Sequence, residues 1–175
     1  MSHDLIRLRQ PIKDDLVHFL SWSKDEELRH LMGWEYPNCE DEMTAWLFNK
    51  NQNRDRRFYI IELAGKPIGD IELCNISWRS GQAEIKICIA NKEYWGQGLG
   101  KRALEIILKE AFETFELSEV YLRVYAFNQR AVHCYEKVGF NLRGILKRRD
   151  PNWQEIWLMS LNKNHYKRSR SLMGA

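Results

Sequence analysis

Residues 94–101 read YWGQGLGK, and this segment joins two different kinds of sequence pattern. Before it, residues 83–89 alternate apolar and polar side chains, as a strand with one buried face does. After it, apolar residues recur at helical spacing from Leu104 to Phe115. The next run, residues 119–125, again has the composition of a strand. Strand, loop, helix and strand in this order predict two parallel strands joined by a crossover helix.

Strand-like runs also lie on both sides of this unit. The earlier runs are residues 5–9, 57–63 and 68–76. A helical segment follows the first of them, and short turns join the others. Because of these short connections, we expect the runs to pair antiparallel. The later ones are residues 143–149 and 154–161, which follow a helix at residues 130–138. Together the runs predict a single α+β domain, with a mixed, largely antiparallel sheet of about seven strands and helices on its faces.

The composition is that of an ordinary globular protein, with 44% hydrophobic and 29% charged residues among 175. The sequence contains neither a membrane-spanning stretch nor an apolar leader at its N-terminus, so a cytoplasmic location is expected. The four cysteines form no CxxC pair and no cluster with histidine, so neither a disulfide nor a metal site is expected. They are Cys39, Cys74, Cys88 and Cys134.

The charge is unevenly distributed along the chain. Residues 162–175 contain four basic residues and no acidic one, and without these four charges the net charge of +3 becomes −1. We therefore expect a folded domain at residues 1–161 and a solvated basic tail at residues 162–175. A domain with this charge is not expected to bind nucleic acid, although contact between the tail and RNA stays open.

Gly96, Gly98 and Gly100 directly precede the predicted crossover helix. Glycines at alternate positions let the backbone turn tightly and expose its N–H groups, and the positive end of a helix attracts an anion. Lys101 is followed by Arg102 rather than by Ser or Thr, so the loop is not a P-loop, and its spacing is not that of a dinucleotide fingerprint. The loop therefore predicts a ligand that carries phosphate but is neither ATP nor NAD.

These residues resemble the acyl-CoA-binding motif of the GNAT N-acetyltransferases, which is Gln or Arg, two residues, Gly, one residue, then Gly or Ala. Gly98 and Gly100 match its glycines, and Trp95 stands where Gln or Arg is expected. The family's second motif, Asn-x-x-Ala-x-x-x-Tyr-x-x-x-Gly-Phe, is matched at every position, by Asn128, Ala131, Tyr135, Gly139 and Phe140. The resemblance covers residues 5–161. It implies the GNAT fold, in which a splayed central pair of strands binds acyl-CoA.

The resemblance also implies which residues contact acetyl-CoA, the expected co-substrate. The pantetheine amides would pair with the first of the two parallel strands, and the pyrophosphate would meet the glycine-rich loop. Two residues of the second motif, Asn128 and Ala131, and the nearby Lys137 complete the set. The implied contacts are Ile87, Cys88, Ile89, Trp95, Gly96, Gln97, Gly98, Leu99, Gly100, Lys101, Asn128, Ala131 and Lys137.

Acetyl transfer to an amine needs both a base and an acid. An alkylamine with a pKa near 10.4 is protonated at pH 7, so a base or a water relay must remove a proton. Glu84 is the candidate base, with a surface pair to Lys86 as the alternative. Tyr135 matches the family tyrosine that protonates the leaving thiolate, with a core aromatic as the alternative. Direct attack in a ternary complex is expected, and an acetyl-Cys88 intermediate is the other possibility.

The acceptor amine is less well defined by the sequence. Acidic residues crowd the first helices, where they would attract a polycation or simply favour helix starts. Residues 31–73 resemble spermidine N-acetyltransferases, which implies a polyamine acceptor. Enzymes that acetylate ribosomal-protein N-termini, aminoglycosides or amino sugars share the pattern, and a non-catalytic acyl-CoA sensor and a homo-oligomer also stay open. The candidate acceptor contacts are Glu35, Tyr36, Glu40, Asp41 and Glu84.

Overall fold

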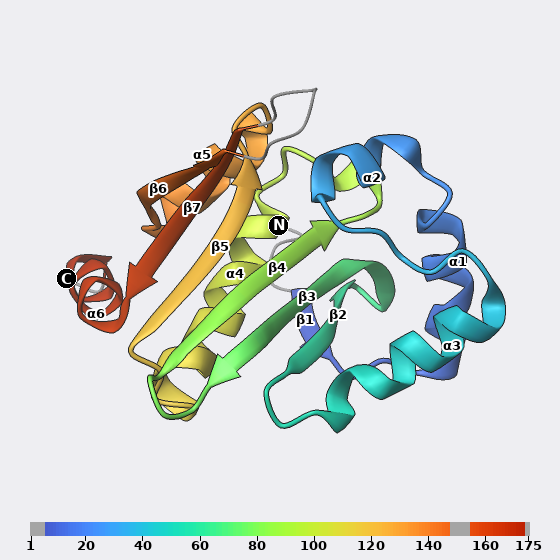
Figure 1. Cartoon of the computed structure of the whole chain (residues 1–175), viewed down its shortest axis with the longest axis horizontal. Helices are drawn as coiled ribbons and strands as arrows, with labels where there is room; N and C mark the ends of the chain where they lie inside the picture. The colour runs from blue at the N-terminus through green and yellow to red at the C-terminus, as the bar shows by residue number, and fades with distance from the viewer. Residues whose placement is uncertain (1–5, 148–154, 174–175) are drawn as a thin grey trace.

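One sheet of seven strands, in the order β1-β2-β3-β4-β5-β7-β6, runs through the molecule (Figure 1). This computed structural model describes residues 6–147 and 155–173. All neighbouring strands are antiparallel except β4 and β5, which are parallel. The predicted mixed, largely antiparallel sheet is therefore confirmed. The strands are β1 (Ile6–Arg9), β2 (Arg57–Leu63), β3 (Lys66–Ser77), β4 (Gln82–Ile89), β5 (Glu119–Tyr125), β6 (Asn141–Lys147) and β7 (Glu155–Asn162).

Helices cover both faces of the sheet, and each face has its own hydrophobic core. On one face, Phe19 and Met43 from the first helices pack against Phe58 of β2. On the other face, Leu104 of the crossover helix packs with Ile85 of β4. The helices are α1 (Leu16–Trp22), α2 (Glu26–Met32), α3 (Glu40–Asn49), α4 (Leu99–Lys109), α5 (Gln129–Val138) and α6 (Lys163–Met173). A π-helical turn, Glu110–Thr114, extends α4, and 3-10 turns lie at Lys13–Asp15, Lys50–Gln52 and Lys92–Tyr94.

The parallel strands β4 and β5 separate soon after they begin. Their register ends with the pair Glu84 and Tyr121, the third pair from the start. β4 nevertheless stays paired with β3 as far as Ile89, which lies opposite Gly69. Figure 1 shows the two strands side by side at one end and apart at the other. The predicted splay is thus present, and it leaves the end of β4 with one free edge.

The C-terminal residues differ from the expected solvated tail, because residues 163–173 form helix α6. The side chain of Tyr166 is buried, and its ring centroid lies 4.8 Å from that of Phe112. Its hydroxyl donates a hydrogen bond of 3.2 Å to Glu113. The basic residues around Tyr166 give this segment the composition of a solvated end, so the packing of one aromatic residue could not be read from composition.

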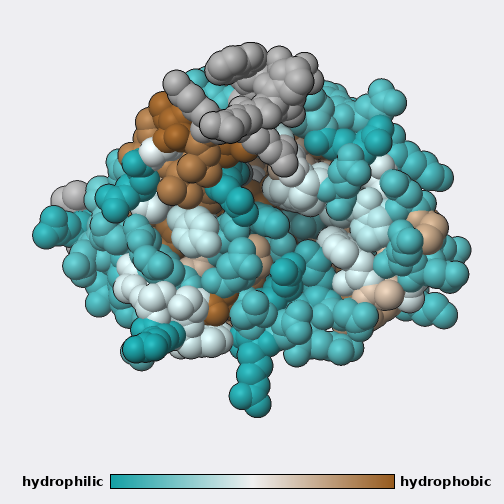
Figure 2. Space-filling view, viewed as in Figure 1, coloured by the Kyte–Doolittle hydropathy of each residue, from teal (hydrophilic) through white to brown (hydrophobic). Residues whose placement is uncertain are grey.

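The edge strand β6 carries exposed apolar side chains. Leu142 and Ile145 are each 47% exposed, and Leu146 is 44% exposed. Figure 2 shows a hydrophobic area at its upper left, on the side where β6 lies in the same view of Figure 1. Within the described ranges, no helix has the length and apolar character needed to cross a membrane.

Candidate active site

A pocket of about 570 Å³ lies where β4 and β5 separate. Its volume falls within the range that is usual for small-molecule sites. Residues of α2, β4, β5, α4 and α5 line it, together with the glycine-rich loop. Every predicted acetyl-CoA contact except Gln97 is among the lining residues, and so is Tyr135. The side-chain amide of Gln97 donates instead to the carbonyl of Glu93, over 2.7 Å.

The glycine-rich loop presents the start of α4 to this pocket. Gly96 and Gly98 have φ values of 75° and 77°, in the left-handed region that glycine adopts without strain. A Cβ on either glycine would meet no atom within 4 Å, so the backbone conformation and not the available space requires glycine. Gly98 is the N-cap of α4, whose first N–H groups have no partner within the helix. An anion can bind there.

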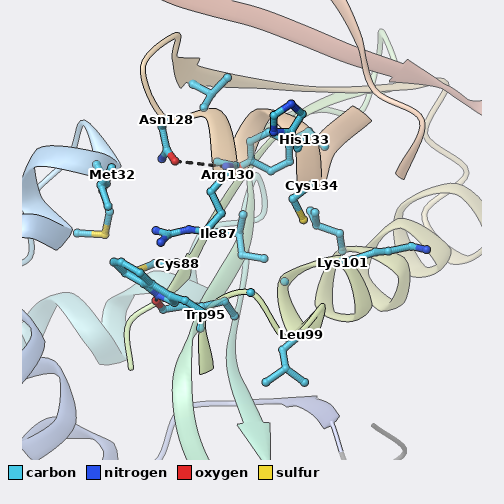
Figure 3. A pocket seen from close by; sticks show the side chains of 18 of the residues that line it. Met32, Ile87, Cys88, Trp95, Leu99, Lys101, Asn128, Arg130, His133 and Cys134 are labelled. Carbon is cyan, nitrogen blue, oxygen red and sulfur yellow. Dashed lines mark hydrogen bonds between the residues drawn. The ribbon is translucent and has the colours of Figure 1, made fainter. Parts of the chain in front are cut away.

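Trp95 binds the last residue of β4 through its side chain. Its indole N–H donates to the carbonyl of Ile89 over 2.6 Å. The guanidinium carbon of Arg130 lies 3.4 Å from the centroid of the indole ring, a contact visible in Figure 3. At the motif position where Gln or Arg was expected, the tryptophan thus carries a cation over its ring. Arg130 itself was not predicted, although it directly precedes Ala131 of the second motif.

Tyr135 reaches the pocket from α5. The side chain of Asn128 caps this helix by accepting a hydrogen bond of 3.3 Å from the N–H of Ala131, the dashed line in Figure 3. Gly139, with a φ of 108°, ends it. Tyr135 is buried, and burial raises the pKa of its phenol well above the usual value near 10. The phenol therefore stays protonated at neutral pH and can donate its proton.

Glu84 lies near the start of β4 and does not line the pocket. Its side chain is buried, and Arg123 binds both carboxylate oxygens over 2.8 and 3.0 Å. Asn75 donates a further hydrogen bond of 3.0 Å. Arg123, not Glu84, faces the pocket. Because its oxygens are already engaged, the geometry does not favour Glu84 as the base or as an acceptor contact. The alternative pair with Lys86 is not formed either, since that ammonium lies over the ring of Trp34 at 5.7 Å.

Tyr36 is a core residue in the structure and does not line the pocket. It is 2% exposed, and its ring packs against those of Phe19 and Trp46. Its hydroxyl donates to the carboxylate of Asp70. The prediction of an acceptor contact here is corrected, because the aromatic cluster of α1 and α3 encloses the side chain.

The predicted acidic residues are exposed and lie outside the pocket. Glu40 and Asp41 occupy the first turn of α3, where the helix dipole favours acids. Glu35 follows Trp34, which does line the pocket. Near the start of α2, the ammonium of Lys92 binds two further acids at 2.9 and 2.7 Å and so offsets part of their charge; they are Asp25 and Glu27.

The far end of the pocket is apolar and was not predicted. Leu28, Leu31 and Met32 of α2 line it together with Trp34. Figure 3 shows Met32 reaching toward the pocket from the side opposite Cys134 of α5. The spacing of three and four residues between these apolar positions signals one helix face, but not what that face contacts.

Residues 6–141 match the family model described as an acetyltransferase (GNAT) domain. The spermidine N(1)-acetyltransferase of Escherichia coli K12 is 34% identical over 101 residues, which are 57% of this chain and 54% of that protein. The chain thus spans about half the length of this relative. An aminoglycoside N(6')-acetyltransferase type 1 of Klebsiella pneumoniae is 24% identical over 183 residues, covering 98% of this chain and 90% of that protein.

The fold is also similar to solved structures. A spermidine N-acetyltransferase from Vibrio cholerae, in complex with CoA and spermine, superposes with a TM-score of 0.83. It is 25% identical, and the superposition covers 93% of this chain and 98% of that one. A second structure of the Vibrio protein, with a TM-score of 0.79 and 25% identity over 93% of this chain and 96% of that one, is dodecameric.

Proposed function

The chain belongs to the GNAT acetyltransferase family, and from this premise we propose that it transfers an acetyl group from acetyl-CoA to a primary amine. One observation carries the proposal: the glycine-rich loop, the free edge of β4 and the phenol of Tyr135 all line one pocket. The start of α4 and Lys101 suit the phosphates of CoA. The edge of β4 that faces the gap near Ile87 suits the pantetheine amides, although the carbonyl of Ile89 is already engaged by the indole of Trp95. Acetyl-CoA, the co-substrate, supplies the activated thioester.

We propose direct attack by the amine on the thioester. Tyr135 donates a proton to the leaving thiolate, which its raised pKa allows at neutral pH. An acetyl-cysteine intermediate would need a thiolate at Cys88. Burial raises the pKa of that thiol well above its usual value, so the nucleophilic form is scarce. The electrostatics thus support a ternary complex over a covalent intermediate.

We propose that the acceptor is a polyamine such as spermidine. The spermidine acetyltransferases among the relatives support this choice. An aminoglycoside is the second candidate, because the match to the Klebsiella enzyme extends over nearly the whole chain. Both acceptors are polycations. No carboxylate is found among the described residues that line the pocket; the exposed Glu35 follows Trp34, which does line it, and is the acid we propose a polycation to meet.

We also propose that the protein works in the cytoplasm, as a homo-oligomer. The dodecameric state of the Vibrio protein supports self-association. The need for acetyl-CoA supports the location.

The test of this function is thiol release from acetyl-CoA with a panel of amines. The panel contains spermidine, spermine, an aminoglycoside, an amino sugar and a peptide with a free Ala or Ser N-terminus. We expect saturable release with a polycation, and a higher KM for it in Glu35→Gln with an unchanged KM for acetyl-CoA. Release with the peptide alone would replace the polyamine by a protein N-terminus. If acetyl-CoA binds but no amine causes thiol release, a non-catalytic acyl-CoA sensor would be favoured.

A further inference from the structure

Arg130 is a pocket-lining cation without an acidic partner. The pocket is lined by four lysine and arginine side chains, which are Lys101, Arg123, Arg130 and Lys137. Arg123 binds Glu84, and the ammonium of Lys101 lies 3.6 Å from a carboxylate oxygen of Glu105. Within residues 6–147 and 155–173, no carboxylate pairs with Arg130 and no acceptor takes a hydrogen bond from its guanidinium. Lys137 shares this lack of a partner, but Arg130 is also stacked on a ring.

The indole of Trp95 holds the guanidinium of Arg130 in place. The guanidinium carbon lies 3.4 Å from the ring centroid, and Figure 3 shows Arg130 reaching from α5 toward Trp95. The indole is itself fixed by its hydrogen bond of 2.6 Å to the carbonyl of Ile89. A planar guanidinium at this distance stacks on the ring, so its N–H groups point outward in their own plane. These donors are therefore available to an anion.

A second cation over the same ring is already neutralised. The ammonium of Lys92 lies 5.9 Å from the centroid of the Trp95 indole. Asp25 and Glu27 bind this ammonium at 2.9 and 2.7 Å. Burial lowers the pKa of Arg130, and the charge of Glu27 does not outweigh that effect. The positive charge that stays uncompensated is thus the one that lines the pocket, where it favours binding of an anion.

The stacked guanidinium lies at the beginning of the glycine-rich loop, because Trp95 directly precedes Gly96. Resting on the proposed function, we propose that Arg130 binds the pyrophosphate of acetyl-CoA and that Trp95 is the residue that positions its guanidinium. The polar side chain expected at motif position 95 is thereby supplied from α5. A guanidinium can bind two phosphate oxygens at once, which adds a charged and directional contact to the N–H groups at the start of α4.

Binding measurements with three ligands test this contact. CoA carries a pyrophosphate and a 3'-phosphate, dephospho-CoA lacks the 3'-phosphate, and pantetheine lacks both. We expect Arg130→Gln to weaken CoA and dephospho-CoA equally, by about tenfold or more, as loss of a charge-assisted hydrogen bond does. Pantetheine should bind to this variant as it binds to the wild type. Calorimetric titration measures the two nucleotides, and NMR titration measures pantetheine.

The same measurements contain the results that would overturn the proposal. A loss confined to CoA would assign Arg130 to the 3'-phosphate, and an equal loss with pantetheine would make its role structural. Arg79→Gln removes the same charge from an exposed position between β3 and β4 and should leave all three affinities unchanged. Arg130→Lys keeps the charge without the planar fork, so its affinity for CoA should lie between those of the wild type and Arg130→Gln.

A double-mutant cycle tests whether Trp95 acts through Arg130. Trp95→Leu removes the ring and should weaken CoA binding about fivefold in the wild type, but not further in Arg130→Gln. Trp95→Phe keeps a ring and should retain most of the affinity. Equal losses from Trp95→Leu in both backgrounds would contradict the positioning role. A wild type that binds CoA but acetylates no amine would refute the proposed function without touching this contact, whereas one that does not bind CoA would refute both.

Discussion

At the scale of single residues, two side chains near the β4–β5 gap differ in what surrounds them. Tyr135 reaches the pocket with a buried phenol whose pKa is raised. Glu84, two strand positions before Lys86, is held by Arg123 and does not reach the pocket. The proposed proton donor therefore lines the pocket, whereas the candidate base does not.

Replacing Tyr135 with phenylalanine tests its role as the acid. We expect Tyr135→Phe to lower kcat about 100-fold, the smaller end of the usual contribution of a general acid, with little change in the KM for acetyl-CoA. Steady-state kinetics measure both. Tyr166→Phe, which removes a hydroxyl on α6, serves as the control and should keep the wild-type kcat. An unchanged kcat in Tyr135→Phe would remove the acid from this position.

Motif residues predicted from the sequence line the pocket, whereas Tyr36 and Glu84 do not. The two motifs place Gly98, Asn128 and Tyr135 because their spacing reflects local structure: a loop, a helix cap and a helix face. Glu84 was assigned as the base because it lies on the polar face of the strand expected to hold the thioester, and Tyr36 was assigned to the acceptor because it lies in the first helical region. Their surroundings depend on contacts with residues far along the chain, such as Phe19 and Arg123, which no local pattern reveals.

At the scale of elements, the junction between the glycine-rich loop and α4 determines whether phosphate can bind. We expect Gly98→Ala to weaken acetyl-CoA binding about tenfold and to destabilise the fold by about 1 kcal/mol, because alanine is strained at this positive φ. Calorimetric titration with CoA and urea unfolding measure the two effects. Gly144→Ala, where a Cβ meets no atom within 4 Å, is the matched control. Equal CoA affinity in the two variants would contradict the assigned role of the loop.

Most elements were predicted at nearly their observed bounds, because their patterns are local. The runs at residues 57–63 and 119–125 coincide with β2 and β5. The apolar stripe from Leu104 to Phe115 indicated one helix, whereas the structure begins α4 at Leu99 and inserts a π-helical turn after Lys109. The turn between the last two predicted strands falls at residues 150–152, outside the described residues.

At the scale of the whole molecule, α6 contributes to the main core and is more than a charged end. Tyr166 is one of the buried residues of the core that contains Phe112. We expect Tyr166→Ala to lower the free energy of unfolding by about 3 kcal/mol, as loss of a buried aromatic residue does. Asn164→Ala, at an exposed position of the same helix, should change it by less than about 0.5 kcal/mol. Equal urea midpoints for the two variants would show that α6 adds nothing to stability.

Global stability should also depend on pH through Asp70. Its pKa is about 7 in the folded protein against 3.8 as a model value, so its stabilising contribution is complete below pH 3.8 and is lost as the pH rises through 7. Asparagine stays neutral and can still accept from Tyr36. We therefore expect Asp70→Asn to be more stable than the wild type at pH 8, by up to about 4 kcal/mol, and by less at pH 5. Urea unfolding at both values measures this; a difference that does not change with pH would contradict the raised pKa.

The central claim is that this pocket brings acetyl-CoA and an amine together. The most direct measurement is mass spectrometry of spermidine and an aminoglycoside after incubation with acetyl-CoA that carries an isotope-labelled acetyl group. We expect one labelled acetyl group on the amine, equal in amount to the thiol released, and about 100-fold slower labelling with Tyr135→Phe. Thiol release without a labelled amine, or bound acetyl-CoA that no amine consumes, would contradict the account.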